Sequence, residues 1–267
     1  MMDITLIVDP LFRLPLAVGL VMAVMLPLLG TLLRLRDEWL AALGLAHLAA
    51  AAGLAGLVVH VPVVAGGAVG AMAGAMAKSV LGSRGNTAYA VMILTGWSLM
   101  FLIAANTTLG GAMGHALVDG QLPFAGAAEL VAATGLLVAC GIALPWLMPR
   151  VIRARFFPRY ERANRLPAWR WHLGFDVLVA LGMAVGVGTV GLMGAFALVF
   201  VPPWLAFRIA TGWRAALVIS TGYGVAAFFV AFAASLALDQ PFGPVLVGVL
   251  LGGALVVVLL DYRRWAV

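Results

Sequence analysis

The stretch "LGFDVLVALGMAVGVGTVGLMGAFALVFVPPWLAF", residues 173–207, decides how this chain is folded. It is apolar almost throughout, and as one helix with a rise of 1.5 Å per residue it would be about 50 Å long. Because the hydrocarbon core of a bilayer is only about 30 Å thick, we expect this stretch to be tilted, broken or doubled back. Glycines at 186, 188, 191 and 194 offer places to turn, and Pro202 and Pro203 should break the regularity of a second helix.

The basic residues choose between one crossing and two. A single crossing would separate Arg208, Arg214, Arg263 and Arg264 from the others, whereas two crossings place all but Arg13 of the 16 Lys and Arg on one side. Short cytoplasmic loops are enriched in Lys and Arg. We therefore expect two crossings, an outside N-terminus and a cytoplasmic C-terminus.

Composition indicates a polytopic membrane protein. Hydrophobic residues make up 64% of the chain and charged residues 10%, where a soluble domain carries about 25% charged residues. We predict an all-α helical bundle of eight or nine transmembrane helices that forms a single domain over residues 1–267. The windows expected to span are residues 14–33, 40–59, 61–77, 87–105, 124–147, 173–190, 191–207, 215–238 and 244–260.

Several functions lack their signatures. The net charge of +6 lies in short gaps between apolar windows, which favours orientation and contact with anionic lipid over nucleic-acid binding. There is no GxxxxGK[ST], HExxH, CxxC or GxSxG motif, so we expect a chain that is not an enzyme and holds no permanent cofactor. If ATP is used, another subunit must hydrolyse it. The single Cys140 is interpreted as a packing residue.

Few polar side chains lie inside the apolar windows. His47 is about 10 Å into its window by helical rise. A buried imidazole is either a ligand or the partner of a helix-to-helix hydrogen bond. Asp176 and Glu129 are interpreted as acids stabilised by the dipole near a helix start. Asp239 belongs to outer loops without Lys or Arg, which suits a cation, although an ordinary polar turn explains it as well.

The longest polar segment, residues 149–171, contains seven Arg, one Glu and three Pro. Aromatic residues lie among these charges, and Arg together with aromatic side chains is typical of contact surfaces. The segment is predicted to face the cytoplasm. Its residues alone leave two alternatives open, docking of a partner protein and anchoring to lipid.

Three stretches resemble one family. "LLGTLLRLRDEWLAALGLAHLAAAAGLAGLVV" (28–59), "VGTVGLMGAFALVFVPPWLAFRIATG" (187–212) and "LDQPFGPVLVGVL" (238–250) are similar in order and spacing to segments of the permeases of zinc and manganese ABC importers. The third stretch follows that family's Asp-x-Pro-x-Gly-Pro turn. Together the three extend over nearly the whole chain.

The resemblance implies partners and sites. Two permease copies would form the pathway in a bacterial inner membrane, with two ABC ATPase subunits inside and a periplasmic metal-binding protein outside. His47 and Asp239 fall on the family's metal positions. Residues 158–167 fall where relatives present a coupling helix, which favours ATPase docking over lipid anchoring; the docking residues implied are Arg159, Glu161, Arg162, Asn164 and Arg165.

One position departs from the family pattern. The family has Asp four residues before its His, and this chain has Leu43 there. Either the ion is held more loosely, the missing ligand comes from another helix, or the substrate differs. Because a hard oxygen ligand is lost and a nitrogen is kept, Zn²⁺ is favoured over Mn²⁺ as the transported ion. A secondary carrier or channel for a cation or small solute, working without an ATPase, is the main alternative, and a scaffold subunit is a third.

Overall fold

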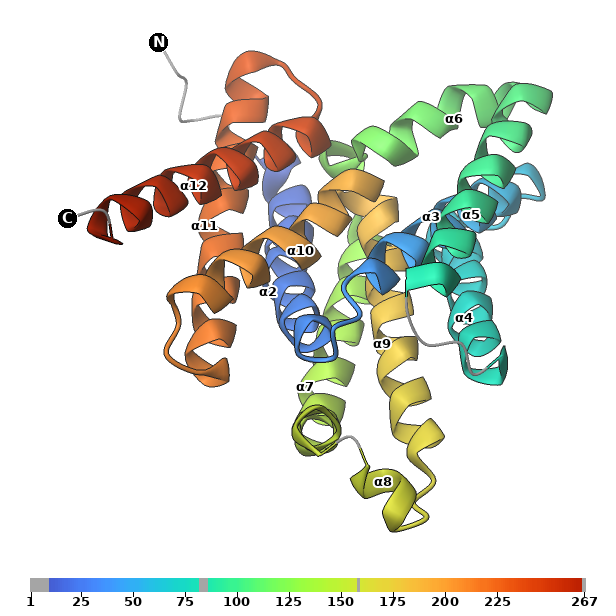
Figure 1. Ribbon diagram of the computed structural model, residues 1–267. Coiled ribbons are helices and arrows are strands. Elements are labelled where there is room, and N and C mark those ends of the chain that lie inside the picture. Colours follow the sequence, from blue (N-terminus) through green and yellow to red (C-terminus); the bar gives the residue numbers. More distant parts are fainter. Residues whose placement is uncertain (1–9, 82–85, 158, 266–267) are drawn as a thin grey trace.

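A computed structural model describes residues 10–81, 86–157 and 159–265. Within these residues all regular elements are helices (Figure 1). In chain order they are η1 (Pro10–Phe12), α2 (Arg13–Leu35), α3 (Leu40–Val58), α4 (Val63–Leu81), α5 (Asn86–Asn106), α6 (Thr108–Asp119), η2 (Leu122–Phe124), α7 (Ala127–Phe156), α8 (Tyr160–Ala163), α9 (Ala168–Thr189), α10 (Leu192–Ile209), α11 (Trp213–Leu238) and α12 (Phe242–Trp265).

The helices match the expected membrane-spanning windows. In the described part of the chain, 8 helices are long and apolar enough to cross a bilayer, and a shorter apolar helix covers Val63–Ser79. Each of the nine expected windows therefore contains a helix. The predicted polytopic helical bundle is confirmed.

The deciding stretch is broken into two helices. α9 ends at Thr189 and α10 begins at Leu192, and Figure 1 shows the chain rising through α9 and returning through α10. Gly191 lies between them with a φ of 87°, a conformation that only glycine adopts readily. The backbone N–H of Gln121 donates to the Thr189 carbonyl at 2.9 Å, which ties the reversal to the segment after α6.

Pro202 and Pro203 lie inside α10, which continues through them to Ile209. Pro203 cannot donate to the Val199 carbonyl four residues earlier. A Cβ added to Gly30 of α2 would lie 1.9 Å from that same carbonyl oxygen. The helix survives because the prolines are packed within the bundle, where α10 lies directly against the backbone of α2.

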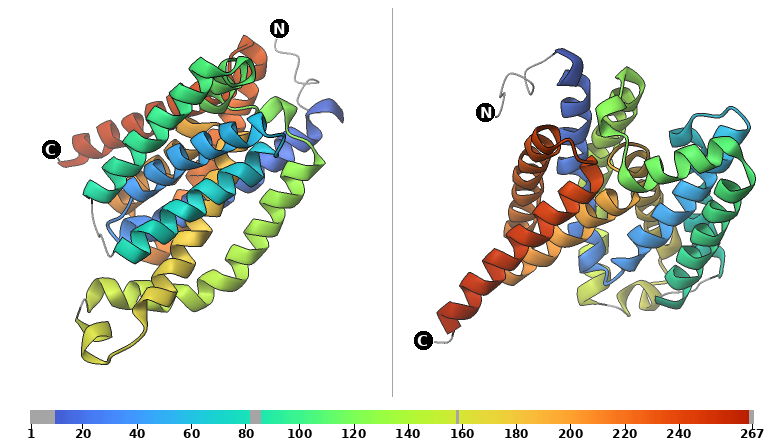
Figure 2. Two further views of the ribbon diagram at one scale, coloured as in Figure 1. Left: turned by 90° about the vertical axis from the view of Figure 1, so that its right-hand side faces the viewer. Right: turned by 90° about the horizontal axis from the view of Figure 1, so that it is seen from above.

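Burial differs between central and peripheral helices. The apolar windows of α2, α3 and α9 are each 67% buried, whereas those of α5 and α12 are 22% buried. Figure 2 shows α5 and α12 at opposite edges of the bundle. Their exposed apolar side chains, such as Leu94, Phe101, Leu255 and Val256, suit contact with lipid or with other membrane helices.

Two expected loops contain helix. α6 occupies most of the outer loop expected between residues 105 and 124, and it begins where the Thr107 hydroxyl accepts a hydrogen bond from the Gly110 N–H at 3.0 Å. α7 continues past its predicted end to Phe156, with Pro145 and Pro149 inside it. Figure 2 shows α7 changing direction before its C-terminal end, as prolines in a long helix cause.

Candidate functional site

His47 lies seven residues after the start of α3 and is 5% exposed. Its Nδ1 is 2.9 Å from the carbonyl oxygen of Leu43, one turn earlier on the same helix. If Nδ1 carries the proton, Nε2 keeps a lone pair that can bind a metal ion. This hydrogen bond holds the imidazole of His47 against α3. The Nδ1 atom of His47 therefore bonds within α3 and not to a neighbouring helix, which was the alternative.

α5 crosses α3 in direct backbone contact at His47. A Cβ added to Gly96 of α5 would lie 2.5 Å from the His47 carbonyl carbon and 2.7 Å from its Cβ. No real Cβ atom is accommodated at such distances without movement of the backbone. Gly96 therefore fixes how closely α5 approaches the imidazole-bearing turn.

Asp239 lies at the C-terminal end of α11 and is exposed. Its φ is 51° and its ψ is 48°, so it occupies the left-handed position that usually ends a helix with glycine. The Gln240 N–H closes the turn by donating to the Ser235 carbonyl at 3.0 Å. The residue thus ends α11, and this end of the helix lies at the end of the bundle opposite α8 (Figure 1).

The structure does not bring His47 and Asp239 into one site. No hydrogen bond or ion pair joins these two side chains. Within residues 10–81, 86–157 and 159–265, no three His, Cys, Asp or Glu side chains gather as metal ligands would. Each residue therefore remains a separate candidate contact for a passing ion.

The predicted docking residues lie around α8, which projects from the lower end of the bundle in Figure 1. Arg159, Asn164 and Arg165 are exposed. Arg162 belongs to α8, but its side chain lies outside the described part of the structure. Arg159 and Arg165 therefore place exposed cations on either side of the short projecting helix, where a partner protein can reach them.

Glu161 is different from its neighbours because it faces back to the bundle. One carboxylate oxygen of Glu161 is 3.2 Å from Nε2 of His172 in the first turn of α9. Both side chains are largely buried, at 17% and 20% exposure. Glu161 therefore connects α8 to α9, a role that its position in a polar segment did not reveal.

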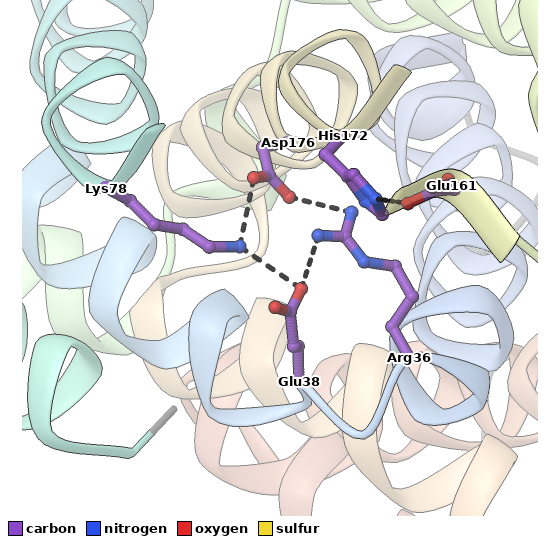
Figure 3. Close-up of polar contacts among 6 residues, drawn as sticks. All are labelled: Arg36, Glu38, Lys78, Glu161, His172 and Asp176. Atoms are coloured by element: carbon purple, nitrogen blue, oxygen red, sulfur yellow. Dashed lines mark hydrogen bonds and ion pairs between the residues drawn. The ribbon is translucent and has the colours of Figure 1, made fainter. Parts of the chain in front are cut away.

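A closed ring of four charges lies at the same end of the bundle (Figure 3). Glu38 is 2.5 Å from Arg36 and 3.1 Å from Lys78, and Asp176 is 2.9 Å from each of the two cations. All four side chains are between 6% and 12% exposed. We call Arg36, Glu38, Lys78 and Asp176 the charge ring.

The ring ties together segments that are distant in sequence. Asp176 of α9 lies 140 residues from Arg36 and 98 residues from Lys78 of α4. Arg36 also lies over the Phe175 ring at 4.9 Å, and Lys78 over the Tyr89 ring of α5 at 5.4 Å. The interpretation of Asp176 as an acid held by the helix dipole alone is incomplete, since its main partners are two buried cations.

The turn between α2 and α3 places two members of the ring. Asp37 has a φ of 60°, and the Glu38 N–H donates to the Leu33 carbonyl at 3.0 Å. This left-handed turn ends α2 and lets Arg36 and Glu38, on either side of Asp37, meet each other. Asp tolerates the conformation better than most residues, and the Asp37 side chain itself is exposed.

Electrostatics favour the charged form of Glu38, the ring carboxylate that lies in the turn between α2 and α3. Burial raises the pKa of Glu38, but the nearby charges of Arg36 and Lys78 lower it by more, with a smaller contribution from His172. The pKa of Glu38 therefore lies below its usual range. The carboxylate is ionised at neutral pH, and the ring carries two positive and two negative charges.

Comparisons with known proteins agree with this architecture. A model described as the ABC 3 transport family matches residues 9–261. Among solved structures, a chain of PsaBC from Streptococcus pneumoniae in complex with Fab has a TM-score of 0.81 and 15% identity, over 95% of this chain and 93% of that one. An inward-facing metal-chelate type ABC transporter has a TM-score of 0.67 and 16% identity, over 97% and 88%. No match was found among curated proteins.

Proposed function

This chain belongs to the ABC 3 transport family, and on that premise we propose that it is the membrane-spanning permease of an ATP-driven importer of a divalent metal ion. The family match over residues 9–261 is the observation that carries the proposal. The fold supports it, since the chain is similar along nearly its whole length to chains of two transporters. ATP hydrolysis belongs to a separate chain, because this sequence has no phosphate-binding loop.

The proposed assembly lies in a bacterial inner membrane. Two copies of the permease form the pathway, an ABC ATPase binds the end that carries α8, and a periplasmic binding protein delivers the ion at the opposite end, where Asp239 lies. The distribution of charge supports this orientation. The described ends of α2, α4 and α10 that carry Arg34, Arg36, Lys78 and Arg208 all lie at the α8 end.

Zn²⁺ is the ion we favour over Mn²⁺. His47 offers an imidazole nitrogen, and Leu43 on the same helix face offers no side-chain oxygen. Mn²⁺ prefers oxygen ligands, whereas imidazole suits Zn²⁺. One weak protein ligand at a time also suits a pathway, because an ion held by a complete cage would not be released.

Coupling takes place at the α8 end in this proposal. Arg159 and Arg165 are exposed for contact with the ATPase, while Glu161 connects the same short helix to His172 of α9. A displacement of α8 by the ATPase would therefore reach the bundle through a side-chain contact as well as through the chain.

Reconstitution tests this function. The permease is placed in vesicles with its ATPase and binding protein, and uptake of radioactive zinc and manganese is measured with ATP on the ATPase side. We expect zinc uptake that requires all three proteins and exceeds manganese uptake. Faster manganese uptake would contradict the ion preference, and uptake that ignores ATP and the ATPase would contradict an ABC permease.

The buried charge ring is the one observation that favours the alternative of a secondary carrier. Ionisable groups buried within a helical bundle often mark ion pathways in such carriers. This alternative predicts uptake by the permease alone when a proton or sodium gradient is imposed across the vesicle membrane. The same vesicles without ATPase therefore distinguish the two functions.

A further inference from the structure

The charge ring and the Glu161–His172 pair lie within one helical turn of each other. His172 and Asp176 are four residues apart on α9, so both side chains lie on the same face of that helix. His172 contacts Glu161 of α8, and Asp176 contacts Arg36 and Lys78. Figure 3 shows the two groups side by side. The contact of α8 with His172 and the ring contacts of Asp176 are thus connected through one turn of α9.

Stability alone does not account for such a ring. Burying four charges has a large desolvation cost, and apolar residues of similar volume usually stabilise a core as well or better. An ionic contact differs from an apolar one because its members can separate into water when the surrounding helices move. Paired and separated states are then two discrete arrangements.

The surroundings of the ring provide a further donor. Tyr89 is 1% exposed, and its hydroxyl makes no hydrogen bond of good geometry within the described structure, although it faces the Glu38 carboxylate. A cavity of about 10 Å³, the size of one water molecule, is lined by Lys78, Tyr89 and Asp176. A buried hydroxyl that makes no hydrogen bond is costly.

We propose that the charge ring is an ionic latch that keeps the α8 end of the bundle closed, and that the Glu161–His172 pair transmits movement of α8 to it. This inference rests on the proposed function and deepens it by naming the route from the ATPase contact to the pathway. In the closed state the ring joins α2, α4 and α9. When the ATPase displaces α8, the pull on His172 shifts the N-terminal turns of α9 and separates Asp176 from its two cations.

Opening of the ring should expose Ala75. This residue is 1% exposed, lies one turn before Lys78 on α4 and lines the same cavity. A cysteine there reports on the ring without altering any of its members. Cys140 is replaced by Ala in the same chain, so the reporter is the only thiol.

The experiment measures how fast Ala75→Cys reacts with a membrane-permeant maleimide in the vesicle-reconstituted complex of permease, ATPase and binding protein. Labelling is compared at rest and during ATP turnover. We expect about a tenfold faster reaction during turnover, as a buried site that opens transiently becomes accessible. Equal rates in the two conditions would overturn the latch.

Two sets of variants separate the latch from its link. Asp176→Asn, or the milder Glu38→Gln if the first does not fold, should raise labelling already at rest because the ring is incomplete. Glu161→Gln should leave labelling at rest slow but abolish the rise during turnover, while the ATPase still copurifies. Asp37→Asn makes the same acid-to-amide change in the same turn outside the ring and should behave as the parent chain.

Each contrary result has its own meaning. If labelling of Glu161→Gln rises during turnover as much as in the parent chain, the Glu161–His172 pair does not transmit the movement. If Asp176→Asn and Glu38→Gln are labelled at rest as slowly as Asp37→Asn, the charge ring is not a latch. If the parent complex shows neither uptake nor ATP hydrolysis that responds to the binding protein, the proposed function fails and the inference falls with it.

Discussion

The ammonium of Lys78 donates a hydrogen bond to the carboxylate of Asp176 at 2.9 Å, joining α4 to α9 across 98 residues of sequence. Lys78 is the only lysine of the chain, and Asp176 lies in α9, one of the helices apolar enough to cross a bilayer. Both side chains are buried. Because neither charge can be left alone in that environment at low cost, the pair makes specific predictions about stability.

Asp176→Asn should destabilise the protein by about 3–5 kcal/mol, the usual cost of leaving buried partners uncompensated. Arg36 and Lys78 would then share Glu38 alone. The joint replacement of Lys78 by Met and Asp176 by Leu should be much closer to the parent, since it removes one charge of each sign and leaves the Arg36–Glu38 pair. Thermal unfolding in detergent measures both. Equal losses for the single and the joint replacement would show that the charges are not paired as described.

Acid should weaken the ring at a pH set by Glu38. Its pKa is lowered in the folded protein, so its contribution to stability is complete above the unfolded pKa of about 4.3 and is lost as the pH falls through the folded value. We expect unfolding temperatures in detergent that are constant from neutral pH to about pH 5 and decline below about pH 4. Glu38→Gln should reduce this decline, and Asp37→Asn should not. Identical acid profiles for both variants would contradict the depressed pKa.

The exposed Arg159 should contribute to association with the ATPase. Arg159→Glu reverses an exposed charge on the projecting segment, so it should reduce copurification of the ATPase, and more strongly at low than at high salt. Its unfolding temperature should stay within the range of ordinary surface changes. Arg214→Glu is the matched control, because it reverses an exposed charge in the first turn of α11. If both variants retain the ATPase equally, residues 158–167 do not dock it.

The course of the chain through the membrane follows from the sequence because hydropathy and glycine are local signals. Each apolar window became a helix, and the break in residues 173–207 lies at Gly191, where the backbone needs a positive φ. The effect of the two prolines on the helix does not follow from the sequence alone, because it depends on packing. Pro202 and Pro203 are buried inside a continuous helix, and no property of the stretch itself reveals the neighbouring α2.

The charge ring was missed for the opposite reason. Taken one at a time, Arg36 and Lys78 count among the cations expected on the cytoplasmic side and Asp176 is explained by a helix dipole, whereas their contacts cross 98 and 140 residues of sequence. A signal was present, because an acid two turns into an apolar helix needs a partner of opposite charge. For His47 the sequence indicates a buried imidazole and the family resemblance implies a metal role, and only the structure shows Gly96 and the Leu43 carbonyl as its neighbours.

Gly96 should tolerate no side chain. Gly96→Ala places a Cβ 2.5 Å from the His47 backbone, so α3 and α5 must separate, at a cost of about 1–3 kcal/mol as in other overpacked cores. Gly135→Ala is the control, because that Cβ meets nothing within 4 Å, and the change should be neutral or stabilising by up to about 1 kcal/mol. Unfolding temperatures of the two variants decide this. Zinc uptake should fall only for Gly96→Ala, since the turn that carries His47 moves.

Asp239 has two roles that a pair of substitutions can separate. Asp239→Asn removes the charge but keeps a residue that tolerates the left-handed conformation, so stability should change by less than about 0.5 kcal/mol. If the carboxylate receives the ion, the rate of zinc uptake at limiting zinc should fall severalfold. Asp239→Gly ends the helix equally well and also lacks the charge, so it should show the same loss of uptake. Uptake at the parent rate in both variants would mean that Asp239 ends α11 and does not receive the ion.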